Sequence, residues 1–85
     1  MIADETLRAL CSPDELERMQ HSIKLEGEIP DLTYIVEDPP RLSARFIAAN
    51  ERKHGMKLLE AVTLPDGWVR CAYRMPWPQP QRKAS

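Results

Sequence analysis

The spacing of apolar residues at the start of the chain predicts a short helix. Leu7, Leu10 and Cys11 follow one another at intervals of three and one residues. Positions i, i+3 and i+4 lie on one face of an α-helix. We therefore expect a helix over Asp4–Cys11 that buries this face.

The next apolar positions predict a second helix with a well-defined start. The run SPDE at positions 12–15 supplies a capping serine, a proline at the first helical position and a glutamate that can return to the serine amide. Leu16, Met19 and Ile23 then form one helical face. The pattern allows two alternative positions for the C-terminal end of this helix. We favour a long helix that stops at Gly27, and the alternative is an end near residue 20 followed by a short strand over Ile23–Leu25.

The middle of the chain predicts a strand and then a helix. Leu32–Val36 is rich in β-branched and aromatic residues, and its nearly continuous apolar character is typical of a central strand. Asp38, followed by two prolines, ends this strand and offers a cap for a helix over Arg41–His54. Gly55 is the expected stop of that helix.

The pattern over Leu58–Met75 predicts a β-hairpin. The sequence LPDGW at positions 64–68 is typical of a three-residue loop in which Gly67 takes the left-handed conformation, so Leu64 pairs with Trp68. This register predicts a core face and an outer face. The core face contains Leu59, Ala61, Thr63, Val69, Cys71 and Tyr73, and the outer face contains Leu58, Glu60, Val62, Trp68, Arg70, Ala72 and Arg74. Glu60 should form ion pairs with Arg70 and Arg74, and the last strand of the hairpin is expected at a sheet edge.

Length and composition fit one domain. The chain has 85 residues, of which 42% are hydrophobic and 29% are charged. We expect an α+β fold over residues 1–75: two N-terminal helices, a strand, a third helix and a C-terminal hairpin, with the helices packed on one face of a small, mostly antiparallel sheet. Residues 76–85 contain three prolines and should form an extended or disordered tail.

The two halves of the chain carry opposite charge. Residues 1–38 contain ten acidic and three basic residues, and residues 39–85 contain nine basic and three acidic residues. Either the halves pack together and neutralise one another, or they present separate acidic and basic faces to partners. The sequence does not separate these two interpretations.

The candidate catalytic and metal-binding residues do not form a recognisable motif. Cys11, His21, His54 and Cys71 are widely spaced, whereas structural zinc sites usually use closely spaced pairs. The three glycines are each explained by a cap or a turn, so no phosphate loop is expected. We therefore expect no metal, no cofactor and no enzymatic activity. The N-terminus lacks the features of a signal peptide, which favours a cytoplasmic protein with two reduced thiols and no membrane segment.

Two binding functions remain. We favour a small accessory or regulatory protein that binds another protein or a second copy of itself, because apolar side chains beside arginine are typical of interfaces. The candidate contact residues are Leu58, Val62, Trp68, Arg70, Arg74 and Trp77. The alternative is a DNA- or RNA-binding regulator that uses its basic C-terminal half. Its candidate residues are Arg41, Arg45, Arg52, Lys53, Arg70 and Arg74.

Overall fold

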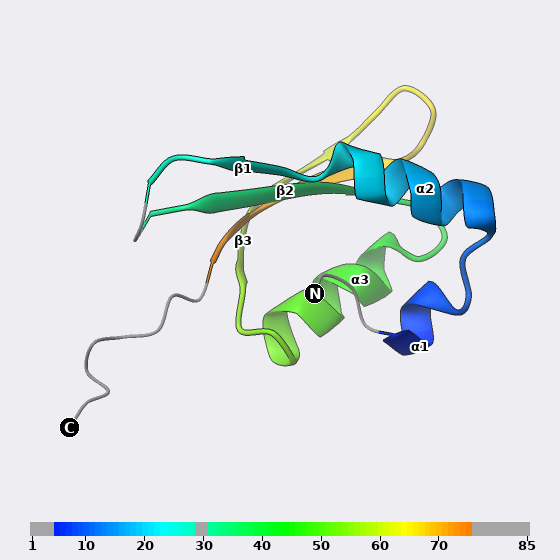
Figure 1. Ribbon diagram of the computed structural model, residues 1–85, viewed down its shortest axis with the longest axis horizontal. Helices are drawn as coiled ribbons and strands as arrows, with labels where there is room; N and C mark the ends of the chain where they lie inside the picture. The colour runs from blue at the N-terminus through cyan, green and yellow to red at the C-terminus, as the bar shows by residue number, and fades with distance from the viewer. Residues whose placement is uncertain (1–4, 29–30, 76–85) are drawn as a thin grey trace.

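A four-stranded antiparallel sheet forms the upper layer of the molecule, with α1 and α3 beneath it (Figure 1). The computed structural model describes residues 5–28 and 31–75. In chain order the elements are α1 (Glu5–Arg8), α2 (Pro13–Ser22), β1 (Lys24–Glu26), β2 (Thr33–Asp38), α3 (Ser43–Arg52), β3 (Lys57–Thr63) and β4 (Val69–Arg74). The strand order is β1-β2-β4-β3. This confirms the predicted α+β class. It also corrects one expectation, because β4 lies inside the sheet and β3 is the edge strand.

Helix α2 begins as the sequence predicts and ends earlier than we favoured. The Ser12 hydroxyl accepts a hydrogen bond from the Glu15 N–H over 3.2 Å, and the Glu15 carboxylate accepts one from the Ser12 N–H over 2.8 Å. The helix stops at Ser22, and Ile23 already has an extended backbone. The shorter alternative is therefore correct. Pairing of β1 with β2 stabilises the extended form, and this contact lies outside the local sequence window.

Gly27 also has a different role from the one expected. It follows β1 and has a φ angle of +91°, so it begins the turn after a strand and does not end a helix. A side chain at this position would meet the backbone carbonyl oxygen of Asp31 at 3.1 Å. The turn therefore requires glycine for both its backbone conformation and its close approach to residue 31.

Helix α3 lacks the side-chain cap that the sequence suggested. Its N-cap is Leu42, which makes no capping hydrogen bond through its side chain. Asp38 is instead the last residue of β2, and the turn through Pro39 separates it from the helix. Gly55 has a φ angle of +67° just after the helix, consistent with the expected stop.

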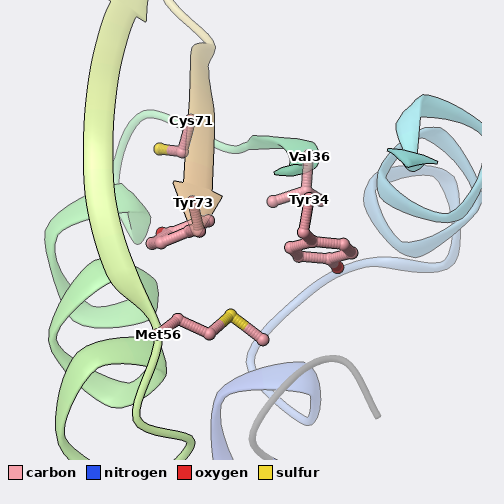
Figure 2. Packing of buried hydrophobic residues seen from close by; sticks show 5 residues of the cluster. All are labelled: Tyr34, Val36, Met56, Cys71 and Tyr73. Atoms are coloured by element: carbon pink, nitrogen blue, oxygen red, sulfur yellow. The ribbon is translucent and has the colours of Figure 1, made fainter. Parts of the chain in front are cut away.

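Two hydrophobic clusters make up the core on the helix side of the sheet. The first lies directly under the strands and contains Tyr34, Val36, Met56, Cys71 and Tyr73 (Figure 2). The second lies between the helices and contains Leu7, Met19, Leu42 and Phe46. Trp68 and Ala49 pack against the second cluster. The two clusters join the sheet to α1, α2 and α3.

The hairpin has the predicted loop, with one irregularity in its first strand. The Leu64 N–H donates to the Trp68 carbonyl oxygen over 2.7 Å, and Gly67 has a φ angle of +96°. The predicted register holds from Thr63 to Glu60 and then shifts at a β-bulge between Leu58 and Glu60. The bulge turns Leu58 towards Tyr73 and the core, and leaves Leu59 45% exposed. The predicted face of Leu58 was therefore wrong, because the alternation assumed a regular strand.

Candidate functional site

The sheet presents a face on the side opposite α1 and α3, which we call the open face. Strand alternation places every second residue of each strand there, in register across the sheet. Its central pair is Ile35 and Ala72, both only half-buried. The open face consists of Lys24, Glu26, Thr33, Ile35, Glu37, Lys57, Glu60, Val62, Arg70, Ala72 and Arg74. It is therefore a mixed surface with a small apolar centre and charged residues of both signs around it.

Strand β3 borders this face as an exposed edge. All of its residues are exposed except Leu58, and Leu59 and Val62 retain 45% and 39% of their accessible surface. The Leu64–Trp68 pair is hydrogen-bonded, and hydrogen-bonded pairs alternate with non-bonded pairs along an antiparallel ladder. Counting back from Leu64 by twos, Val62 and Glu60 therefore direct their backbone N–H and C=O groups towards β4. The N–H and C=O groups of Ala61 and Thr63 therefore point away from the sheet. No described strand lies on that side of β3.

Three of the predicted contact residues come together on the open face. Val62 is paired with Arg70 across β3 and β4, and Arg74 lies on the same face one row beyond Ala72. Arg74 reaches Asp31, with 3.5 Å between the guanidinium and the carboxylate. The expected ion pairs of Glu60 are absent within residues 5–28 and 31–75, and Arg70 likewise has no ion pair there. Glu60 and Arg70 are thus two exposed charges of opposite sign with no partner in the described chain.

The other predicted contact residues have different surroundings. Leu58 packs against the core cluster under the sheet, for the reason given above. Trp68 is half-buried and packs against the cluster between the helices. Trp77 lies outside the described residues. The predicted contact residues that share the open face are therefore Val62, Arg70 and Arg74, and Leu58 is not among them.

Arg18 fixes Trp68 in place. Its guanidinium lies over the indole ring, 4.0 Å from the ring centroid. It also donates to the Glu37 carboxylate over 3.1 Å and to the Asp66 carboxylate over 2.6 Å. The hydrogen bond from Arg18 is the main reason that the pKa of Asp66 lies below its usual value. One side chain of α2 thus joins the helix to β2 and to the hairpin turn.

A polar hollow lies beside this contact, between α2 and the end of β2. Its volume is about 500 Å³ and it opens broadly to solvent. It is lined by Asp14, Glu17, Arg18, His21, Ser22 and Glu37. Among the described residues, no three His, Cys, Asp or Glu side chains are grouped so that they could hold a metal ion. The hollow borders the open face at Glu37, and its described side chains do not form a metal site.

The basic residues of the nucleic-acid alternative do not share one surface. Arg41 is held by the Glu15 carboxylate and by the Leu10 carbonyl oxygen. Arg45, Arg52 and Lys53 are exposed and belong to α3 and its C-terminal end, beneath the sheet. Arg70 and Arg74 lie on the open face, on the opposite side of the sheet.

A buried polar cluster beneath the sheet was missed by sequence reasoning. Asp38 is 1% exposed, and the Cys71 thiol donates a hydrogen bond to its carboxylate over 3.7 Å. Burial raises the pKa of Asp38 to about 7 and that of Cys71 to about 12. Within the described part of the chain, the Tyr73 hydroxyl and the Asn50 Oδ1 atom are buried without a hydrogen-bond partner. The only sequence signal was Asp38 itself, placed between a strand and two prolines, and we interpreted it as a cap.

This cluster is closed to solvent. Asp38, Asn50, Cys71 and Tyr73 are all buried, and both cysteines are free thiols. Cys71 is inert in this setting because a raised pKa leaves little thiolate at neutral pH. Cys11 is more accessible, but burial also raises its pKa.

Comparison with known proteins gives no match. No protein-family model, no curated protein and no solved structure matches this chain. Within the described residues, no helix has the length and apolar character needed to span a bilayer. The open face and the β3 edge are therefore the features of this chain that bear on its function.

Proposed function

We propose that this chain is a non-catalytic binding protein that acts by presenting its β3 edge and open face to another protein chain. The observation that carries the proposal is the exposed edge. Ala61 and Thr63 direct unpaired backbone donors and acceptors outwards, and the neighbouring Leu59 and Val62 are apolar and exposed. An extended segment from a partner can add to such an edge as a further strand, with hydrogen bonds from its main chain.

The composition of the surface supports the same proposal. Val62, Ile35 and Ala72 form an apolar strip across three strands, and Arg70 lies at its border. Apolar contacts flanked by arginine are typical of protein interfaces. The charges around the strip are of both signs, which favours a partner of mixed charge over a polyanion.

Photocrosslinking in cells tests the proposal. A photoreactive amino acid replaces Val62 on the open face in one variant and Arg52 on α3 in a matched control. We expect covalent adducts with a protein at position 62 and none at position 52, because the two positions lie on opposite sides of the sheet. The absence of any protein adduct at position 62 would contradict the proposal.

Binding of nucleic acid is the competing outcome. Purified protein is titrated with duplex DNA and with single-stranded RNA at low and moderate salt, and amide chemical shifts are followed. We expect no specific shifts. A response that weakens steeply with salt and maps to Arg45 and Arg52 would favour the nucleic-acid function over the protein partner.

A further inference from the structure

We infer that the partner of the β3 edge is a second copy of this chain, paired antiparallel through β3 about a two-fold axis at Ala61. The inference depends on the proposed function, since it identifies the occupant of the same edge. Two copies joined in this way form one continuous eight-stranded sheet with both open faces on the same side. The inference is supported by the backbone directions, the allowed registers and the two unpaired charges.

The backbone of β3 suits self-pairing at Ala61. Its N–H and C=O groups point outwards, so Ala61 and the partner subunit's Ala61 can exchange two hydrogen bonds across the axis. Thr63 also points outwards, and it then lies opposite the partner subunit's Leu59. This contact covers Leu59, which is 45% exposed in the single chain.

The neighbouring registers are less favourable. In an antiparallel pair, residues that lie directly opposite each other have their side chains on the same face of the sheet. A two-fold axis perpendicular to the sheet must therefore pass through the position of one β3 residue and its copy, and not between two neighbouring residues. An axis at Glu60 places two glutamates directly opposite each other, which is destabilising. An axis at Val62 places Val62 opposite the partner subunit's Val62 and moves the partner subunit's Glu60 one row away from Arg70, so the two charges no longer lie in line. Ala61 is the central position of β3 that avoids both problems.

The charges on the open face are complementary in this register. Glu60 lies opposite the partner subunit's Val62, and Val62 lies beside Arg70 within each chain. Arg70 and the partner subunit's Glu60 are then two strands apart, about 10 Å between Cα atoms, a gap that the two side chains span together. Neither residue has an ion pair in the described chain. The two-fold axis makes this contact twice.

A charge exchange followed by sedimentation velocity of the purified full chain tests the inference. We expect the wild type to show a monomer–dimer equilibrium that depends on concentration. Glu60→Arg and Arg70→Glu should each raise the dimer dissociation constant about tenfold or more, because each replaces two attractive contacts by two repulsive ones. The double variant should return it close to the wild-type value. Both side chains are exposed, so thermal unfolding of the variants should resemble that of the wild type.

A second variant tests the axis itself. Ala61→Arg places two arginines against each other on the two-fold axis and should abolish the dimer. A wild type that remains monomeric at all concentrations, or a double variant no tighter than the single ones, would overturn the inference. A monomeric wild type that still gives adducts with another protein at position 62 overturns self-pairing and leaves the proposed function intact.

Discussion

Asp38 is an acidic residue in a position that strongly disfavours negative charge. It is 1% exposed, and burial raises its pKa from 3.8 to about 7. The Cys71 thiol contacts its carboxylate, and burial also raises the pKa values of Cys71, Tyr34 and Tyr73. None of these groups supplies a positive charge. Asp38 therefore remains protonated in the folded protein at mildly acidic pH.

This environment gives the folding stability a defined pH dependence. The unfolded chain loses the Asp38 proton near pH 3.8, whereas the folded chain retains it up to about pH 7. Between these values the folded state binds more protons, so the free energy of unfolding falls as the pH rises. Glu15 acts in the opposite direction at lower pH, because the Arg41 hydrogen bond lowers its pKa to about 2 and its contribution is lost as the pH falls through that value.

Replacement of Asp38 by asparagine should remove this dependence. We expect Asp38→Asn to resemble the wild type at pH 4 and to be more stable at pH 8 by on the order of 4 kcal/mol, because no buried charge forms. Urea unfolding at a series of pH values provides the measurement. An equal fall in stability between pH 4 and pH 7 in both proteins would show that Asp38 is not its source.

The two cysteines should differ in reactivity. Cys71 is fully buried and its pKa is raised to about 12, whereas Cys11 is only partly buried. We expect iodoacetamide to alkylate Cys11 in the native protein and Cys71 only after unfolding. Mass spectrometry of the digested protein measures both sites. Faster labelling of Cys71 than of Cys11 under native conditions would contradict the closed cluster.

At the scale of the elements, local signals were predictable and non-local ones were not. The Ser12–Glu15 capping box and the loop at Gly67 each depend on a few consecutive residues, and both are present as predicted. The end of α2 depends on pairing between β1 and β2, which a local pattern does not contain. The bulge at Leu59 likewise changes the face on which Leu58 lies, and no glycine or proline marks it.

The hairpin turn offers a test of an element that sequence did predict. Gly67 has a φ angle of +96°, and a Cβ atom there would lie 3.4 Å from the Pro40 Cγ atom. We expect Gly67→Ala to lower the free energy of unfolding by about 1–2 kcal/mol, because an L-residue is strained at this φ. Gly67→Asn should cost less, since asparagine tolerates positive φ better. Chemical denaturation compares the three proteins, and an alanine variant as stable as the wild type would contradict the turn conformation.

At the scale of the whole molecule, the sequence predicted which candidate contact residues share one face of the sheet, but not how the sheet is assembled. Val62, Arg70 and Arg74 share the open face as predicted from alternation. The two sets of basic residues lie on opposite sides of the sheet, and β3 rather than β4 is the edge, because both facts depend on the order in which the strands assemble. Some of the opposite charge of the two halves is neutralised within the fold, because Arg41 pairs with Glu15 and Arg18 pairs with Asp66.

Amide hydrogen exchange along β3, measured by NMR as a function of protein concentration, tests the central claim most directly. The outward amides of Ala61 and Thr63 should exchange rapidly in dilute protein and become protected as the concentration rises. The inward amides of Glu60 and Val62, which bond to β4, should be protected throughout and change little. Rapid exchange of Ala61 and Thr63 at every concentration would contradict the pairing of two β3 edges.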